Sequence, residues 1–463
     1  MRTKNGHLYA SYLTDMTFGN PMGVIFSFAL PLLIGNIFQQ IYTMVDTIAV
    51  GHILGDEAIS AIGATSAIYS LIITFATGLN SGFSIVAARN FSKIFDRKIQ
   101  RTVFGIFVIN AVSTVLLTGL SIVSIVPLMR FLNTPDSVFD DAYAYILVLC
   151  IGLFSTIGYN MFAGILRAFG DSKTPLYALI VACVVNVALD FPLVMLMGVT
   201  GAALATVIAQ TVSAIFCAIT FFKLCYFFVP EKKDMHVERE LLFEIVTSGI
   251  SMALMMCVVS IGSVIFQRAN NLLGEDIIAA HSSSHKIFTV FLQPVAALST
   301  ALSTFVSQNH GSGRYDRVRS ALWRVILVVA GWGILSCIIV YLVGDPAIRL
   351  LTATENEVIV SNAVMSMRIC LPFFSILGAL QCLRTAMQAM GCKTAPVLSS
   401  CVEVLMKIVG AAFLIPAYGY FGACITEPLT WVAMLAFLAV SYLILYKKIY
   451  VKRPITIGFD IVD

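Results

Sequence analysis

Apolar residues run in long blocks along almost the whole chain, and short polar stretches separate one block from the next. Window by window we count twelve such blocks. Their approximate limits are residues 22–50, 58–88, 102–129, 139–166, 175–197, 200–224, 241–268, 277–308, 319–344, 357–388, 396–416 and 420–446. Each block can cross a hydrocarbon core of about 30 Å, which takes roughly 20 helical residues. The pattern therefore predicts an all-α integral membrane protein with twelve transmembrane helices.

The composition agrees with a membrane protein. Of the 463 residues 59% are hydrophobic and 12% are charged, whereas a soluble domain would carry about twice that charge. No signal peptide is expected, because the polar N-terminus runs to Asn20 before the first block begins. The 11 cysteines fall almost all within or beside the blocks without a CxxC pair, so we expect core residues and no disulfide framework. The sequence has no GxxxxGK(S/T) phosphate loop, so any transport would use a gradient unless a separate ATPase subunit assists.

The charge of the loops alternates along the chain. The loops after the even-numbered spans and the C-terminal tail are rich in Lys and Arg, most clearly at residues 89–101, 223–239 and 314–324. The opposite loops are acidic or lack charge. By the positive-inside rule, both termini lie in the cytoplasm and the chain crosses the cell membrane many times. The net charge of +4 reflects this bias, so no nucleic-acid partner is expected.

The sequence contains an internal repeat. The stretch RAFGDSKTP resembles QAMGCKTAP, and an offset of 221 aligns Gly170 with Gly391 and Gly201 with Gly422. Earlier in the chain, GHILGDEAISAIGA resembles NNLLGEDIIAAHSS at an offset of 219. Spans 1–6 and 7–12 are therefore two copies of one six-helix unit that enter the membrane in the same sense. We expect a pseudo-two-fold axis along the membrane normal, with a substrate path between the copies.

The repeat predicts the domain organisation. We expect an N-lobe at residues 1–224, a cytoplasmic inter-lobe loop at 225–240, and a C-lobe at 241–463 that ends in a short cytoplasmic tail. Such a duplication is typical of transporters, and nothing in it demands a partner subunit, so a monomer is expected. An enzyme is not expected, because no nucleophile–base pair or metal cluster is evident. His281 and His285 lie one turn apart, but a metal site needs more ligands.

Oxygen-bearing side chains of the first half fall at one depth in the membrane. Span 1 runs outward and carries Asp46 near its outer end. Span 5 also runs outward and carries Asn186 and Asp190 in its outer half, whereas span 6 runs inward and carries Thr206 within two turns of the outer face. These side chains come from three helices of one repeat, so we expect them to share one level.

Tyr42 and Ala202 lie one helical turn before the span 1 aspartate and the span 6 threonine. Two carboxylates, an amide oxygen, a hydroxyl and a free carbonyl would form a cage of hard oxygen ligands that suits a proton or Na⁺. Insertion of a charged carboxylate at that depth costs on the order of 3 kcal/mol on insertion scales. We therefore expect such a residue to have a function. In the alternative interpretation, Asp46 lies in the headgroup zone and Asp190 caps a kink before Pro192.

Pro31 lies fifteen residues before Asp46, about 22 Å along the helix. Proline removes a backbone donor and can kink span 1. A bend that depends on protonation of Asp46 would be one way to couple an ion to movement. Candidates to line a cavity in this half are Tyr143, Tyr145, Tyr159 and Asn160.

The second half differs at the matching positions. At the repeat offset the amide and hydroxyl of the cage align with Lys407 and Glu427, and Glu403 lies one turn before the lysine. We hypothesise that Lys407 is a tethered cation paired with Glu403 or Glu427, and that removal of a partner is costly. In the alternative, these residues line a wet cavity between the halves. Lys286, midway along span 8, is a candidate for either arrangement.

These segments also carry a resemblance to a known family. The chain resembles the multidrug and toxic compound extrusion (MATE) exporters across nearly its whole length, through LPLLIGNIFQQIYTMVDTIAVGHILG, the RAFGDSKTP turn before span 5 and the NVALDFPL segment that follows. The resemblance implies two lobes around a V-shaped central cavity. It also implies efflux of cationic, aromatic or lipophilic organic compounds in exchange for H⁺ or Na⁺, with drug resistance as the outcome and no cofactor.

Prokaryotic members of this type carry a cation site in the first lobe. Some relatives use acids on helices 7 and 10 instead, and this chain has none there, which argues against a coupling site in the second lobe. The helix 5–6 connection looks shorter here than in relatives. By match of motif, the first-lobe site corresponds to Asp46, Asn186, Asp190, Ala202 and Thr206, with Tyr42 nearby and Pro31 at the family spacing.

A flippase for a lipid-linked precursor is the alternative function, because related folds perform that task. A cavity for diphosphate headgroups should be rich in inward Arg and Lys. The spans of the first half contain almost none, which favours export of neutral or cationic solutes. The partners expected are therefore small organic substrates and membrane lipids. The one metal ion expected is Na⁺ at the Asp46–Asp190 site, if Na⁺ is the coupling ion.

Overall fold

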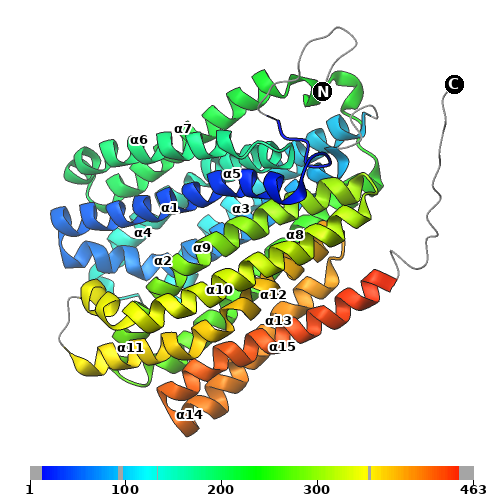
Figure 1. The fold of residues 1–463 in the computed structure, drawn as a ribbon. Coiled ribbons are helices and arrows are strands. Elements are labelled where there is room, and N and C mark those ends of the chain that lie inside the picture. The colour runs from blue at the N-terminus through cyan, green and yellow to red at the C-terminus, as the bar shows by residue number, and fades with distance from the viewer. Residues whose placement is uncertain (1–12, 92–96, 133, 353–355, 448–463) are drawn as a thin grey trace, which may run out of the picture. The chain divides into compact units, whose positions relative to one another are not determined.

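The computed structural model describes residues 13–91, 97–132, 134–352 and 356–447. The side chains at 42–49, 56–57, 59, 351–352 and 446 lie outside this description. All regular elements within these residues are helical, and Figure 1 labels the α-helices.

The first repeat contains seven α-helices, and the second contains the remaining ones, interrupted by short 3₁₀ or π segments labelled η. Those of the first half are α1 (Pro21–Leu54), α2 (Asp56–Phe91), α3 (Lys98–Phe131), α4 (Asp136–Ile151), α5 (Leu153–Ala168), α6 (Lys173–Met197) and α7 (Val199–Leu224), followed by η1 (Tyr226–Phe228) and η2 (Lys232–Asp234). Those of the second half are α8 (Arg239–Asn271), α9 (Glu275–Gly311), α10 (Tyr315–Thr352), α11 (Glu357–Cys370), η3 (Leu371–Phe373), α12 (Phe374–Ala389), α13 (Thr394–Val409), η4 (Gly410–Leu414), α14 (Ile415–Tyr418) and α15 (Tyr420–Tyr446).

The number of spans agrees with the hydropathy pattern. Among the described residues, 11 candidate spans are long and apolar enough to cross a membrane, and the bent pair α4 and α5 makes up to 12. The twelve predicted helices are therefore confirmed. The fourth span was expected as one helix over 139–166, but it breaks at Gly152 with a bend of 41°. The matching span of the second repeat is interrupted by η3, between α11 and α12.

The backbone of the two repeats agrees at matched glycines. Gly170 and Gly391 have φ angles of 87° and 90°, and Gly198 and Gly419 have 63° and 59°. Positive φ strains any residue with a Cβ, so glycine is needed in these turns. Shortly after the turns at Gly198 and Gly419, each repeat has another glycine that lies close to a backbone carbonyl. Gly201 lies against the carbonyl of Leu193, and Gly422 lies against that of Leu414. The offset of 221 thus relates the close backbone contacts of the two repeats as well as their amino-acid sequences.

The chain divides into two compact units. Unit 1 comprises Met1–Ile261 with Thr289–Arg314, and unit 2 comprises Gly262–Phe288 with Tyr315–Asp463. Helices α8 and α9 therefore contribute one segment to each unit. The lobes predicted at 1–224 and 241–463, and the V-shaped cavity between lobes, stay predictions.

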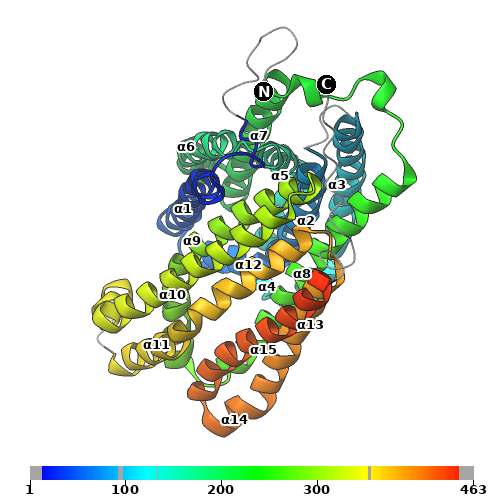
Figure 2. The same cartoon turned by 45° about the vertical axis from the view of Figure 1, so that its right-hand side comes forward.

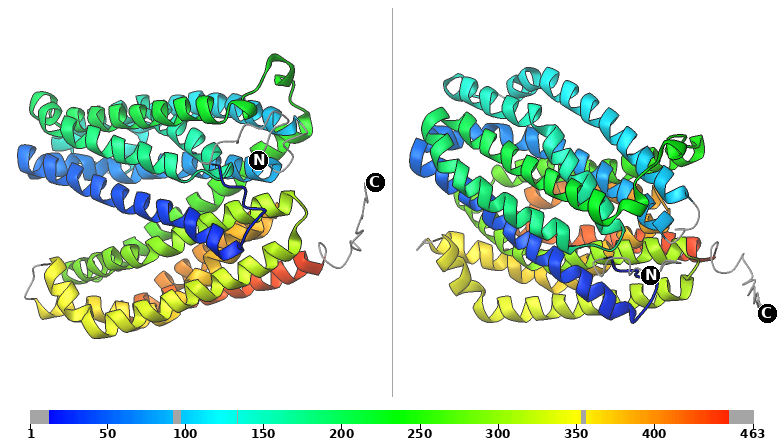
Figure 3. Two further views of the ribbon diagram at one scale, coloured as in Figure 1. Left: turned by 45° about the horizontal axis from the view of Figure 1, so that its top comes forward. Right: turned by 90° about the horizontal axis from the view of Figure 1, so that it is seen from above.

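Unit 1 is held by aromatic packing and by contacts between small residues. The ring of Phe169 lies 4.6 Å from that of Phe228 and 5.4 Å from that of Phe91, centroid to centroid. Helices α1, α5, α6 and α7 pack along one another, in blue to green in Figure 3. Gly82 of α2 lies directly against the backbone of Ser248 in α8. Small residues allow this approach, as is typical of helix pairs in membranes.

The segment before α1 is attached to the end of α9 within unit 1. Gln308 accepts a hydrogen bond from the Met16 backbone N–H at 2.9 Å and donates one to the Ala168 carbonyl at 2.8 Å. Asn309 donates to the Met16 carbonyl at 3.1 Å, and Arg314 donates to the carbonyl of Thr17 at 2.5 Å. This segment thus has partners about 300 residues away in sequence, a separation that sequence pattern alone does not reveal.

Unit 2 repeats the same kind of packing. Helices α13 and α15 lie side by side, in orange and red in Figures 1 and 2, and α10 packs against α12. Gly333 of α10 lies against Ser375 of α12, and Ser375 donates a hydrogen bond to the Ala330 carbonyl at 2.8 Å. The π segment η4 brings Gly410 against Thr426 of α15.

Replacement of Gly82 by alanine tests the contact between α2 and α8. An added Cβ would overlap the Ser248 backbone, so we expect a loss of roughly 1–3 kcal/mol in unfolding free energy from overpacking. Gly119→Ala in α3 is the matched control, because its Cβ would meet nothing within 4 Å. Thermal unfolding in detergent should show a lower midpoint for Gly82→Ala alone. Equal midpoints for the two variants would contradict the close approach.

Candidate functional site

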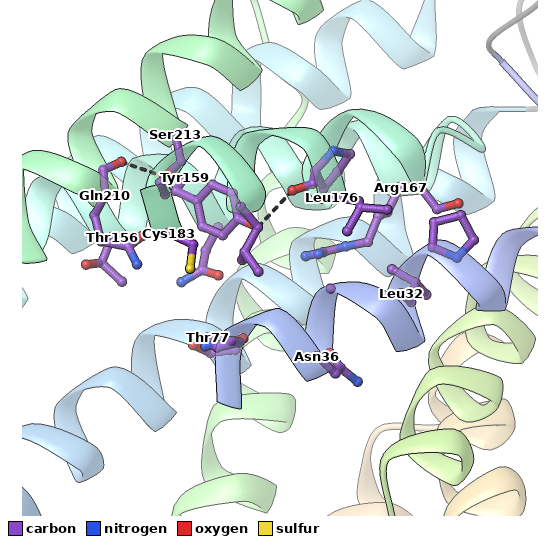
Figure 4. A pocket seen from close by; sticks show the side chains of 18 of the residues that line it. Leu32, Asn36, Thr77, Thr156, Tyr159, Arg167, Leu176, Cys183, Gln210 and Ser213 are labelled. Atoms are coloured by element: carbon purple, nitrogen blue, oxygen red, sulfur yellow. Dashed lines mark hydrogen bonds between the residues drawn. The ribbon is translucent and has the colours of Figure 1, made fainter. Parts of the chain in front are cut away.

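A cavity of about 260 Å³ lies inside unit 1, among α1, α2, α5, α6 and α7 (Figure 4). This volume is near the lower end of the range for small-molecule pockets. The lining residues are Pro31, Leu32, Gly35, Asn36, Gln39, Ile73, Thr77, Thr156, Tyr159, Asn160, Arg167, Ser172, Pro175, Leu176, Leu179, Ala182, Cys183, Gln210 and Ser213.

The lining mixes apolar surface with neutral hydrogen-bonding groups. Tyr159 donates a long hydrogen bond of 3.5 Å to the Pro175 carbonyl, and Ser213 donates one of 2.9 Å to the Gln210 carbonyl (Figure 4). Among the lining residues that the structure describes, Arg167 is the charged one. Such a cavity offers amide and hydroxyl groups in the interior of a membrane protein, where few polar groups are otherwise found.

A single face of α6 runs outward from this cavity. The buried residues of α6 include Ala178, Ala182, Asn186, Asp190 and Val194, spaced by four. Residues four apart lie above one another on a helix. The cavity is lined by the second of them, so the amide and the carboxylate continue the same face one and two turns beyond it.

The turn before α6 determines where this helix, and with it the buried face, begins. Asp171 accepts hydrogen bonds from the backbone N–H groups of Lys173 and Thr174, both at 3.0 Å. This capping satisfies amides that would be unpaired at the beginning of the helix. The preceding residue, Gly170, lies against the backbone of Thr14. The close contact of Gly170 and the capping by Asp171 thus explain these two residues of the RAFGDSKTP motif.

Asn186 and Asp190 are fully buried, with exposed fractions of 0%. The Asn186 amide donates a hydrogen bond of 3.3 Å to the Asp190 carboxylate. The amide oxygen of Asn186 has no hydrogen-bond partner in the part of the chain that the structure describes. A carboxylate in such a place is stable when it is protonated or when a cation lies beside it.

A hydrophobic cluster closes the outer end of this arrangement. Val50 of α1, Val194 of α6 and Ala202 of α7 pack in it, with exposed fractions of 1%, 1% and 4%. Helices α1 and α6 run toward this cluster, and α7 runs away from it. Asp46 and Asp190 stand four residues before the two valines, and the predicted threonine stands four after the alanine. The structure therefore brings these three helix positions to one level, one turn inside the cluster.

The remaining predicted site residues are placed as follows. Asp46 and Tyr42 lie on α1, but their side chains lie outside the described residues. Thr206 is half-buried on α7, and within the described residues it forms no hydrogen bond with the α6 pair. Pro31 is buried and lines the cavity, inside a helix that continues from Pro21 to Leu54.

Two of the four cavity candidates line the cavity. Tyr159 and Asn160 face it from α5. Tyr143 packs instead against a hydrophobic cluster around Ile125, and Tyr145 packs against the cluster that closes the outer end. Both tyrosines lie on α4, beyond the break at Gly152, which explains why they miss the cavity.

Unit 2 holds a buried network of charges at the matching level. The Lys407 ammonium lies 3.2 Å from Glu403, 3.7 Å from Glu427 and 3.1 Å from the Ser263 hydroxyl. The side chains of Lys407 and Glu403 are 6% and 11% exposed. Arg384 approaches Glu403 at 4.0 Å and donates to the Ser400 hydroxyl.

The charged residues of this network can be compared with the residues at the matching positions of unit 1. Lys407 and Glu427 occupy the positions that Asn186 and Thr206 hold in the first repeat. In unit 2 the side chains at these two positions approach each other to 3.7 Å. Lys286 is exposed and forms no ion pair with any carboxylate that the structure describes, so it does not join the network.

Sequence reasoning missed several polar residues of the cavity. Asn36 and Gln39 on α1, Thr156 on α5 and Gln210 on α7 line it. The available signal was spacing: the two α1 amides stand three residues apart, and Gln210 follows the predicted threonine by four. Neutral amides are common enough in membrane spans that spacing alone would have been weak evidence.

A family model and several known proteins match this chain over most of its length. The MatE family model matches residues 31–192 and 251–413. The chain is 25% identical over 447 residues to the probable multidrug resistance protein YoeA of Bacillus subtilis, covering 93% of this chain and 94% of that protein. It is 23% identical over 444 residues to the probable multidrug resistance protein NorM of Thermotoga maritima, covering 93% and 92%.

A solved structure supports the fold. A multidrug resistance MATE family transporter of the MOP superfamily, in an outward-facing conformation, superposes with a TM-score of 0.87 at 20% identity. The match covers 97% of this chain and all of the other. At this level of identity the likeness shows the fold, and it agrees with the twelve helices in two repeats.

Substitution of Lys407 tests whether the network in unit 2 is coupled. Removal of the ammonium leaves the buried Glu403 and the half-buried Glu427 without it, so Lys407→Ala should lower the unfolding free energy by roughly 3–5 kcal/mol. Neutralisation of one acid in addition, by Glu403→Gln, should recover part of that loss. Thermal unfolding of both single variants and the double variant gives the coupling energy. Lys286→Ala is the control and should have little effect, and simple additivity of the Lys407 and Glu403 substitutions would remove the tethered-cation hypothesis.

Proposed function

The chain belongs to the MatE family, and from this premise we propose that it is a secondary active multidrug exporter that exchanges organic compounds for H⁺ or Na⁺. Family members are transporters, and the many apolar helices make this chain a multi-pass membrane protein. The proposal extends to a monomer in the cell membrane, with both termini in the cytoplasm and no cofactor.

The observation that carries the proposal is the buried Asn186–Asp190 pair on α6. It lies between a cavity on one side and a closed hydrophobic cluster on the other. Asp190 stands on the helix face that lines the cavity, two turns beyond Ala182. We propose that an ion enters by this route and is held between Asp190 and the oxygens of Asn186, Asp46 and Thr206.

The energetics favour an ion-binding role over a structural one. A buried carboxylate in a membrane helix costs several kcal/mol when it is charged. A protein gains nothing from such a residue in packing, because leucine would fill the space at lower cost. The cost is offset when a proton or Na⁺ neutralises the charge, and the unpartnered oxygen of Asn186 is placed to add a ligand.

The substrate would occupy the unit 1 cavity. Its apolar and amide lining suits lipophilic compounds with a few hydrogen-bonding groups. We propose that a cationic substrate is favoured because two acidic residues, Asp46 of α1 and Asp190 of α6, stand on their helices beyond the cavity's outer end. The same carboxylates would then bind either the coupling ion or the positive charge of the substrate, which makes the two compete.

Competition of this kind is enough for exchange. Two ligands that need the same carboxylates exclude each other, so binding of the ion releases the substrate. Each ligand shifts the balance between two conformations only by its difference in affinity for them. Pro31 lines the cavity within α1, where it removes a helical hydrogen bond. We propose it as the point at which that helix responds to the charge on Asp46.

Efflux from proteoliposomes tests the proposal. A fluorescent organic cation is loaded, and its movement is driven separately by a pH gradient and by a Na⁺ gradient. We expect one gradient to drive efflux by the native protein, and we expect Asp46→Asn and Asp190→Asn each to reduce that efflux to background with normal expression.

Asp140→Asn is the control, because Asp140 is an exposed carboxylate at the start of α4. It removes one acidic charge and should leave efflux unchanged. Native rates in Asp46→Asn would remove the proposed role of that residue. If neither gradient moves any of several chemically different dyes, the exporter proposal fails, and transfer of a lipid-linked precursor becomes the next function to measure.

A further inference from the structure

Arg368 of unit 2 is an exposed arginine within a membrane-spanning segment. Arg368 lies in the span Glu357–Ala389 and is exposed. Its guanidinium lies over the Tyr341 ring, 5.6 Å from the centroid, and the Tyr341 hydroxyl donates to the Arg368 carbonyl at 3.3 Å. No carboxylate among the described residues lies within ion-pair distance of this guanidinium. Its charge therefore calls for a partner from outside the chain.

The arginine opens into a groove of about 480 Å³ between α10, α11 and α15. Val364, Met365 and Ile369 of α11 and Phe421 of α15 form apolar walls. Asp345 of α10 and Ser361 of α11 supply polar groups. The groove is thus apolar along part of its length and charged at two points.

Two observations place the groove at the surface that meets lipid. Ile334, Ile338 and Leu342 form a row along α10 at a spacing of four, and they are 60%, 51% and 76% exposed. Such a row on a membrane helix faces hydrocarbon. Helix α15 begins at Tyr420, directly beside Phe421 of the groove. The groove therefore lies where that span ends, at the level of lipid headgroups.

The charges of the groove are ordered along the membrane normal. Arg349 pairs with Asp345 at 2.9 Å and with Glu357 at 2.8 Å, which fixes the loop ends of α10 and α11 at one level. Two carboxylates and one guanidinium leave an excess negative charge there. Arg368 lies eleven residues beyond Glu357, about 16 Å further from the loop at the level of Cα. The groove is therefore positive at its deeper end and negative nearer the surface.

A phospholipid headgroup with a phosphate and an ammonium group has the complementary order. Its phosphate lies next to the acyl chains, and its ammonium projects toward water. We propose that this groove binds the headgroup of an ethanolamine phospholipid, with the phosphate on Arg368, the ammonium on Asp345 and one acyl chain along the exposed row of α10, past Ile338 and Ile334.

The chemistry favours ethanolamine over related headgroups. A primary ammonium donates three hydrogen bonds, whereas a quaternary choline nitrogen donates none. The Asp345 side chain is 50% exposed, so its carboxylate is accessible to such a donor in addition to Arg349. A phosphatidylglycerol headgroup would match the arginine but would place hydroxyl groups where the groove presents a carboxylate. Guanidinium binds phosphate in two-point geometry, which adds to its preference for this group.

Native mass spectrometry of the delipidated full-length protein in detergent tests this assignment. The protein is titrated with phosphatidylethanolamine, phosphatidylcholine and phosphatidylglycerol that carry identical acyl chains. We expect phosphatidylethanolamine to bind about tenfold more tightly than phosphatidylcholine, the factor for one charge-assisted contact. Equal affinities for these two lipids would overturn the proposed ammonium contact. Tightest binding of phosphatidylglycerol would show a simple anion site and would overturn the headgroup assignment.

Three variants separate the two contacts. Arg368→Gln should weaken both phosphatidylethanolamine and phosphatidylcholine by about tenfold. Asp345→Asn should reduce the affinity for phosphatidylethanolamine to that for phosphatidylcholine, with the latter unchanged. Arg130→Gln is the matched control, because Arg130 is an exposed cation in the last turn of α3 and should have no effect. Native lipid affinities in Arg368→Gln would overturn the site.

The folded state of each variant is verified by thermal unfolding without added lipid. If Arg368→Gln is poorly folded, Arg368→Lys keeps the charge but loses the two-point geometry, and it should weaken both lipids by a smaller factor. Native affinities in that variant would count against the phosphate contact. The inference requires only that the chain spans a membrane, so it stands or fails separately from the efflux measurement.

Discussion

The interior of a bilayer offers no hydrogen-bond partner, so every polar group placed there needs one within the protein or its ligands. This constraint accounts for the exclusively helical elements of the described chain, because a helix satisfies its own backbone. It also explains why the buried polar side chains come in groups. Asp190 has Asn186 beside it, and Lys407 has Glu403 and Glu427. We infer a lipid at Arg368, whose guanidinium has no carboxylate beside it among the described residues.

The two repeats satisfy the same constraint differently at matching positions. In the first, an amide and a hydroxyl occupy positions that a lysine and a glutamate occupy in the second. The second repeat therefore neutralises its acids with a cation of its own chain. In the first repeat, the coupling ion that we propose would take the place of that cation. A difference between duplicated halves is thus more informative about function than their similarity.

The sequence was a good guide to the fold because hydropathy reports directly on burial in lipid. It placed all twelve spans, and the repeated glycines identified turns whose φ angles agree between halves. It did not reveal the break at Gly152, because Ile151 and Leu153 on either side are as apolar as the rest of the span. Nor did it reveal that α8 and α9 are shared between two compact units, since that depends on contacts between segments far apart in sequence.

The site was predicted where a strong signal coincided with helical spacing. Asn186 and Asp190 stand four apart in an apolar segment, and the structure shows them in contact. Of the partners of Lys407, Glu427 followed from the repeat offset and Glu403 from its position one helical turn earlier. The cavity lining was mostly missed, because amides such as Asn36 and Gln39 carry no charge and so stand out little against a membrane span. Lys286, a candidate for either arrangement of the unit 2 charges, forms no ion pair with a described carboxylate, since a position in a span does not tell which way a side chain points.

The attachment of the N-terminal segment to α9 has a consequence for biogenesis. Met16 finds its hydrogen-bond partners in Gln308 and Asn309, which are synthesised almost 300 residues later. During translation the first six spans are therefore inserted while this segment still lacks its native partners. It can form its native hydrogen bonds only after the eighth span has been made, long after the helix that follows it directly in sequence. The first repeat, although it resembles a complete unit, cannot finish its own assembly without the second.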